Sequence, residues 1–167
     1  MKSPEAALEE VLAKYVMRAK ALEQRLVSII QFGSTVRGPL KRETDIDLLL
    51  IFEKLPVGRL ARSEIVEGIE KVCLEELTKN LPKDYNICFS SKLKTVEESQ
   101  RFSILYLDMV DRSKILFDPR GLASSLIEKT KNWIQQSGAY RVEKGLKWYW
   151  VLGKDASWDE ESPIGWQ

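Results

Sequence analysis

Apolar residues along this chain follow two patterns, one typical of helices and one typical of buried strands. Residues 4–22 place apolar side chains at helical spacing. Residues 26–32 and 46–52 are mostly apolar segments of strand length, as buried strands are. Helical spacing returns at 60–81 and at 122–136. The pattern therefore predicts a domain built from both helices and strands.

The segment between the two predicted strands carries a turn and two acids. Gly33 and Ser34 end the first strand, and Ser34 is expected to cap a short helix over 35–38 whose backbone N–H groups point outward. Outward N–H groups beside a hydroxyl are a common way to hold phosphate oxygens. Asp45 and Asp47 stand two positions apart at the start of the second strand, so both side chains point to one face.

Paired carboxylates beside a phosphate cradle suit a divalent cation. Mg²⁺, or Mn²⁺ in its place, takes a few carboxylates and fills its other positions with water and substrate phosphates. Gly33, Ser34 and the two acids together therefore predict a metal–nucleotide site for nucleotidyl transfer. Each half alone is common, because Gly-Ser turns and acidic strand entrances also occur without such a function.

Three basic residues lie in the spacer between the turn and the acids. Arg37, Lys41 and Arg42 are candidates for contacts with triphosphate oxygens or with the leaving pyrophosphate. Ordinary solvated loop charges explain these three residues equally well.

Gly33-Ser34, followed by Asp45-Ile46-Asp47 and an aliphatic run to Phe52, resembles the signature of the DNA polymerase beta-type nucleotidyltransferase superfamily. Within it, the chain resembles the minimal nucleotidyltransferases of bacteria and archaea. Many of these are encoded beside HEPN-domain proteins, and some are antitoxins that transfer AMP to that partner. The resemblance implies ATP or another nucleoside triphosphate as donor, a divalent metal, and an α+β fold whose mixed sheet is flanked by helices. Residues 102–110 and 114–117 are similar to the helix and final strand that close the family core.

The resemblance and the turn signals divide the chain into a core and an extension. We expect a nucleotidyltransferase core at 1–118, a C-terminal helix and strand at 119–153 packed on that core, and a poorly ordered polar tail at 154–167, all within a single domain. The run Trp148-Tyr149-Trp150 predicts either a strand that fastens the tail to the core or a face for a base or a partner.

The third carboxylate of the superfamily is not evident in this sequence. The resemblance places it on a strand corresponding to 85–89, where the best-aligned polar residue is Asn86. An amide cannot take up a proton. Asp84 shares a strand face with Asn86 and is the candidate third metal ligand, although a turn residue before a strand explains it equally well.

The composition excludes several classes of function. The 167 residues are enough for one ordinary domain, and 26 basic against 25 acidic residues give no general attraction to nucleic acid. The absence of histidine excludes histidine ligands, bases and triads. Cys73 and Cys88 lack metal or disulfide spacing and are expected to be buried and reduced. Without a signal segment or a membrane-length apolar run, a cytoplasmic protein that does not bind membranes is expected.

Two hypotheses follow from these observations. The first is a Mg²⁺-dependent enzyme that moves a nucleoside monophosphate, AMP from ATP according to the resemblance, to a hydroxyl acceptor. That acceptor is a HEPN partner protein or a small molecule. The second hypothesis, favoured by Asn86, is a nucleotidyltransferase fold that has lost catalysis and acts as an antitoxin or regulator by binding a protein.

Overall fold

A four-stranded mixed sheet forms the centre of the computed structural model, which describes residues 2–144 and 147–152. Its strands are β1 (Leu26–Phe32), β2 (Glu43–Phe52), β3 (Asn86–Thr95) and β4 (Lys114–Phe117). Their order across the sheet is β3-β2-β1-β4, so β3 and β4 are the edges. β2 runs parallel to β3, whereas β1 is antiparallel to both of its neighbours. This arrangement confirms the expected α+β fold with a mixed sheet.

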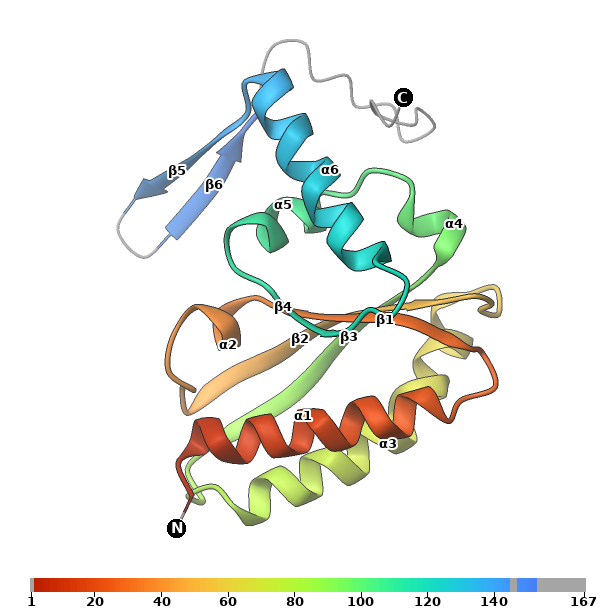
Figure 1. The fold of residues 1–167 in the computed structure, drawn as a ribbon. Helices are drawn as coiled ribbons and strands as arrows, with labels where there is room; N and C mark the ends of the chain where they lie inside the picture. Colours follow the sequence, from red (N-terminus) through yellow and green to blue (C-terminus); the bar gives the residue numbers. More distant parts are fainter. Residues whose placement is uncertain (1, 145–146, 153–167) are drawn as a thin grey trace.

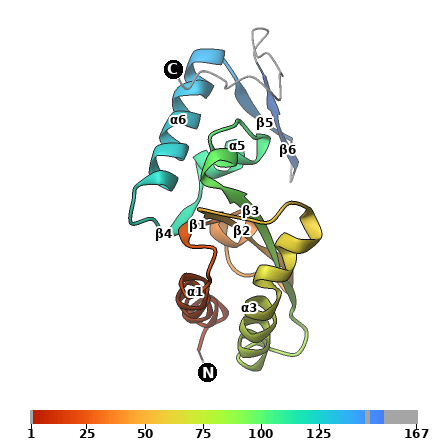
Figure 2. The same cartoon turned by 90° about the vertical axis from the view of Figure 1, so that its right-hand side faces the viewer.

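Helices cover both faces of the sheet (Figure 1). α1 (Pro4–Lys20) and α3 (Arg59–Lys79) lie side by side on one face, and α5 (Ile104–Asp111) and α6 (Leu122–Ser137) lie on the other, as the rotated view in Figure 2 also shows. The short helices α2 (Ser34–Arg37) and α4 (Val96–Ser99) follow β1 and β3. None of the described helices is long and apolar enough to cross a membrane.

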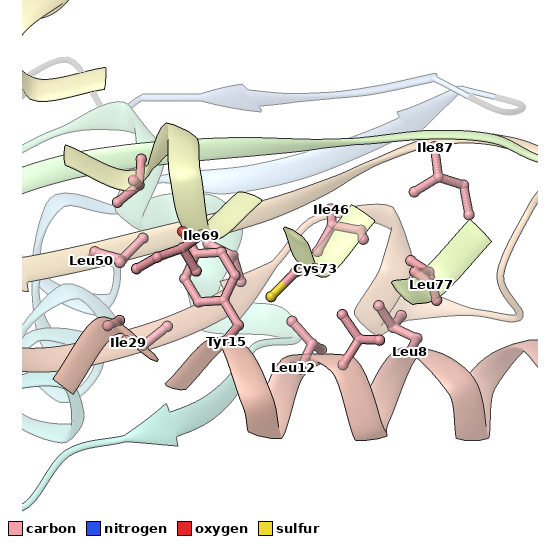
Figure 3. Close-up of a cluster of buried hydrophobic side chains, with 14 of the residues drawn as sticks. Leu8, Leu12, Tyr15, Ile29, Ile46, Leu50, Ile69, Cys73, Leu77 and Ile87 are labelled. Carbon is pink, nitrogen blue, oxygen red and sulfur yellow. The ribbon is translucent and has the colours of Figure 1, made fainter. Parts of the chain in front are cut away.

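The alternation of side chains along β2 creates two cores. Ile46 and Leu50 point toward α1 and α3, where they meet Leu12 of α1 and Cys73 of α3 (Figure 3). Leu49, like Ile51 two residues later, points to the opposite face and packs in the cluster under α5 and α6. Because the period of a strand is two, Asp45 and Asp47 must share the face of Leu49. The acids therefore lie on the side of the sheet that α5 and α6 cover.

The observed element bounds agree with most of the predicted ones. The strands expected at 26–32 and 114–117 have those bounds, and the other expected helices are present to within a few residues at their ends. The third strand was expected at 85–89, but β3 extends to Thr95. It pairs with β2 over its whole length, from Glu43 opposite Asn86 to Phe52 opposite Thr95. Its later half is rich in serine and lysine because it is an edge strand, so it lacks the apolar run that predicts a strand.

The C-terminal extension differs from the expected helix and single strand. After α6 the chain forms a hairpin, β5 (Tyr140–Lys144) and β6 (Lys147–Val151), which pair only with each other in the described part of the chain. The prediction missed β5 because its alternating charged residues carry no core pattern. Figure 1 shows the hairpin extending from the end of α6. The predicted tail at 154–167 lies outside the described residues.

Candidate active site

A cavity of about 890 Å³ opens beside the start of β2. It brings together six of the eight predicted site residues. These are Gly33, Ser34, Arg37, Lys41, Asp45 and Asp47. The remaining lining includes Glu43 and Thr44 of β2, Asn86, Cys88, Ser90 and Lys92 of β3, and Leu105 and Asp108 of α5. The cavity therefore joins the turn, the acidic strand entrance, the edge strand and a helix from the covering layer.

Gly33 stands in direct contact with Asp47. Its φ of +79° lies in the region that favours glycine. A Cβ atom at this position would lie 3.0 Å from Cγ of Asp47 and would overlap Oδ2. The contact arises because Phe32, immediately before the turn, pairs with Asp47 across the β1–β2 ladder. The glycine thus lets the backbone of the turn approach the carboxylate as closely as atoms permit.

Ser34 has a different role from the predicted one. Gly33 is the N-cap of α2, and no side-chain cap hydrogen bond is present there. The Ser34 hydroxyl instead lies 2.7 Å from that of Thr44, so a hydrogen bond ties the turn to the entrance of β2. The expectation that Ser34 caps the helix is wrong, because helix α2 begins at Ser34 itself. The hydroxyl still lines the cavity.

The two acids differ in their surroundings. Burial raises the pKa of Asp47, and the negative charge of Asp45 adds to that shift, while a hydrogen bond from Ser90 opposes it. Asp45 accepts a hydrogen bond from the Cys88 thiol at 2.9 Å. Cys88 was expected to be buried but is exposed, because it faces the open end of the sheet beside Asp45. Cys73 is buried, as expected.

Arg37 is held in place from several directions. Its Nε donates to the Gly33 carbonyl at 3.2 Å, and its guanidinium lies 4.9 Å from the ring centroid of Trp148 on β6. Such a cation–π contact orients a guanidinium without neutralising it. An ion pair between Arg141 of β5 and Asp111 of α5 joins the hairpin to the covering helix. Trp148 of β6 therefore reaches the candidate site, whereas Tyr149 beside it is exposed.

Two of the predicted site residues are not brought to the cavity. Arg42 and Asp84 form an ion pair with each other, 3.0 Å between Nη1 and Oδ2, and both side chains are largely exposed. Neither is among the described residues that line the cavity. Asp84 thus precedes β3 and lies outside the strand, as expected if it is only a turn residue.

Sequence reasoning did not assign Asp108 to the site, although the residue lines the cavity. Burial raises its pKa, the Arg37 guanidinium opposes that shift, and the negative charge of Asp47 adds to it. The available signal was a single acid in the middle of the apolar helix Ile104–Asp111. A carboxylate at a mid-helix position among core residues usually needs a partner or a function.

The lining can hold a divalent cation through Asp45 and Asp47. Both are hard oxygen donors on one face, and a cation there would relieve the cost of two nearby, partly buried negative charges. Among residues 2–144 and 147–152, no group of three or more acidic or cysteine side chains is placed to share one ion. The remaining positions of the cation would therefore fall to water and substrate phosphates, which is the coordination that Mg²⁺ favours.

Residues 12–105 match the family described as "Nucleotidyltransferase domain". The chain therefore belongs to this family and is a nucleotidyltransferase. Among named relatives, the "Putative protein adenylyltransferase MJ1305" of Methanocaldococcus jannaschii is 26% identical over 147 residues, which cover 86% of this chain and 95% of that protein.

Solved structures of toxin–antitoxin systems also resemble the chain. One with AMP-PNP is 15% identical with a TM-score of 0.46, covering 75% of this chain and 92% of its own. The MntA-HepT toxin–antitoxin is 13% identical with a TM-score of 0.44, covering 77% and 92%. Because both TM-scores are below 0.5, we draw nothing about this chain from them.

Proposed function

We propose that this protein transfers AMP from ATP to a hydroxyl group of a protein, with Asp45 and Asp47 holding Mg²⁺ or Mn²⁺. The observation that carries the proposal is the contact of the Gly33 turn with Asp47, which joins a phosphate-binding turn to a metal-binding pair in one cavity. ATP and a protein acceptor are supported by the name of the adenylyltransferase relative. Nucleotide and cation are thus bound as one unit.

The reaction forms one bond and breaks one. The acceptor oxygen attacks the α-phosphorus of ATP, the bond from that phosphorus to the oxygen bridging to the β-phosphate breaks, and pyrophosphate leaves. The cation supplies charge neutralisation at the α-phosphate and at the leaving group. Gly33 N–H and the Ser34 hydroxyl bind the terminal phosphates, and Arg37 and Lys41 offset the charge of the departing pyrophosphate.

Asp108 is our candidate for the group that accepts the proton of the acceptor hydroxyl. It lines the same cavity as Asp45 and Asp47, yet it is not grouped with them in a three-ligand cluster within the described residues. A carboxylate that is near the metal pair and outside its coordination is free to take a proton. Asp84, the candidate third metal ligand, is instead paired with Arg42 and does not line the cavity.

Transfer of label from [α-³²P]ATP tests the proposal. We expect Mg²⁺-dependent labelling of a purified HEPN-domain protein used as acceptor, and release of pyrophosphate in equal amount. Asp47→Asn should abolish the labelling, whereas Asp84→Asn, a matched substitution outside the cavity, should retain it. Full activity of Asp47→Asn would eliminate the site.

The rival function is that of a protein-binding antitoxin or regulator whose nucleotidyltransferase fold has lost catalysis. One observation favours it. The β3 residues beside the two acids, Asn86, Cys88 and Ser90, include no carboxylate. Calorimetry separates the two functions. The enzyme should bind ATP more tightly with Mg²⁺ than with EDTA, whereas a site without catalysis should show the same affinity in both.

A further inference from the structure

A second cavity, of about 790 Å³, lies along the edge strand β3. It is lined by Arg59 and Arg62 of α3 and by Lys92 and Lys94 of β3, together with serines, and no carboxylate of the described residues lines it. We call this second cavity the basic cleft. It shares the lining residues Lys92 and Leu105 with the active-site cavity, so the two cavities are adjacent.

The positive charge of the basic cleft is only partly neutralised. Arg62 makes two hydrogen bonds of 2.8 Å to the carboxylate of Glu98. In the described part of the chain Arg59 and Lys94 form no ion pair of their own, and only the negative charge of Glu98 acts on Lys94 from a distance. The Lys94 ammonium is partly buried and lies 4.9 Å from the ring centroid of Tyr106. A partly buried ammonium without an ion pair loses hydration that a bound anion would replace.

Exposed apolar residues are next in sequence to residues that line the cleft. Val57 and Leu60, which flank the lining residues Gly58 and Arg59 in sequence, are 96% and 75% exposed. Ile104, between the lining residues Ser103 and Leu105, is 58% exposed. A small anion such as phosphate would not cover these side chains. A protein segment that carries both acidic and apolar side chains would cover them.

The position of the cleft relative to the metal pair fits the acceptor side of the reaction. Along the parallel ladder Asp45 pairs with Cys88, Asp47 with Ser90, Leu49 with Lys92 and Ile51 with Lys94. Ser34 contacts Thr44, so the phosphate-binding turn lies at the opposite end of this series. In-line displacement requires the acceptor to approach the α-phosphorus from the side away from the pyrophosphate. With the terminal phosphates at the turn, that side faces Lys92 and the basic cleft.

We propose that the basic cleft binds an acidic segment of the protein acceptor, next to the hydroxyl that receives the nucleotide. The inference rests on the proposed function and adds the chemical class of the acceptor. Lys92 lies where the two cavities meet, and Arg59 and Lys94 bind carboxylates further from the reacting group. The neighbouring exposed apolar residues then pack against the same segment of the acceptor.

Binding of synthetic peptides tests this separately from catalysis. The probes are two fluorescein-labelled peptides of equal length, one with a tyrosine between runs of glutamate and one with the same tyrosine between runs of lysine. Fluorescence anisotropy is measured with Mg²⁺ and a non-hydrolysable ATP analogue. We expect the glutamate peptide to bind the protein about tenfold more tightly than the lysine peptide, with an affinity that falls as salt increases.

Charge reversal locates the binding site. Arg59→Glu should weaken binding of the glutamate peptide by about tenfold, because it reverses an exposed charge of the cleft. Lys71→Glu is the matched control, since Lys71 is exposed on the same helix and lines neither cavity among the described residues. It should change the affinity less than twofold, within the small effect of a distant screened charge. Lys94→Met, which keeps the length of the side chain, should repeat the loss.

The outcomes separate this inference from the proposed function. Equal affinity for both peptides, or equal effects of Arg59→Glu and Lys71→Glu, would overturn the acidic acceptor even if AMP transfer is measured. Acidic-peptide binding that depends on Arg59, in a protein that transfers no AMP, would uphold the cleft and overturn the function. If Lys94→Met only promotes aggregation and leaves peptide affinity unchanged, the lysines protect the sheet edge and the inference is wrong.

Discussion

Replacing Gly33 with alanine places a methyl group directly against Asp47 in the candidate site. The added Cβ would overlap Oδ2 of Asp47 and would lie 3.2 Å from its Cβ. The obstacle is the first part of a side chain on a central strand, which has little freedom to move away. Asp47 must therefore rotate or the turn must shift, and either change separates the proposed phosphate-binding backbone from the proposed metal ligand.

The expected effect of Gly33→Ala has two parts, a loss of stability and a loss of rate. A non-glycine residue in the backbone conformation of Gly33, with φ of +79° and ψ of −155°, costs about 1–3 kcal/mol, which should appear as lost stability. Displacing a ligand by about 1 Å costs on the order of 100-fold in rate, equivalent to about 2.7 kcal/mol of barrier. We expect Gly33→Ala to lower kcat/KM by on the order of 100-fold while the protein still folds.

Gly38→Ala is the matched control at the other end of helix α2. A Cβ at Gly38 would meet no atom within 4 Å, and its φ of −169° is extended backbone that any residue adopts. This variant should keep both the melting temperature and the rate of AMP transfer close to those of the unmodified protein. The assay is transfer of label from ATP, with urea unfolding of both variants. If Gly33→Ala retains more than about a third of the activity, the contact with Asp47 does not organise the site.

Three further predictions concern the site, the hairpin and the core. Burial raises the pKa of Asp47, so its ionisation opposes folding: stability from this group is full below the usual carboxyl pKa and declines as pH rises through the folded-state value. Asp47→Asn should therefore raise Tm in EDTA at neutral pH, and the gain should vanish as the pH is lowered toward the usual carboxyl pKa; a gain that grows with acidity would refute this. Trp148→Ala should raise KM for ATP several-fold with a smaller change in kcat, because the guanidinium in contact with the ring loses its orientation, whereas Trp148→Phe should restore most of the affinity and Tyr149→Ala, at an exposed position, should leave KM unchanged. Leu12→Ala should cost about 2–5 kcal/mol in urea unfolding, while Met17→Ala, 71% exposed on the same helix, should cost less than about 0.5 kcal/mol.

The sequence was sufficient to predict the elements that follow simple periodicity. The strand Leu26–Phe32 and the shared face of Asp45 and Asp47 follow from apolar runs and the two-residue repeat of a strand. The turn at Gly33 was also predictable from the sequence, since Gly33 adopts a backbone conformation that only glycine takes readily. These features depend on residues within a few positions of one another, so a single sequence carries them.

Features that depend on distant segments could not be predicted in this way. Cys88 faces Asp45 only because β3 is parallel to β2 in that register, and no local pattern encodes the register. Arg42 was assigned to the site because it lies in the spacer, and Asp84 because it was expected to share a strand face with Asn86, yet the two form an ion pair with each other. Trp148 reaches Arg37 because α6 reverses the chain and the hairpin returns toward the sheet. In each case the missing information is a contact between elements that are far apart in the chain.

The division of the site between core and extension has a consequence for specificity. The family match covers residues 12–105, which include the turn, the acidic pair and every residue of the basic cleft. Asp108 and Trp148 lie beyond that match, and the hairpin that carries Trp148 is joined to α5 through Arg141 and Asp111. Any acceptor that displaces the hairpin would therefore disturb Arg37 and, through α5, the candidate proton acceptor. We expect Arg141→Ala, which breaks this junction, to lower the rate of transfer to a protein acceptor by a larger factor than it weakens ATP binding measured by calorimetry. A loss of ATP affinity as large as the loss of rate would instead mean that the hairpin serves only to hold the nucleotide.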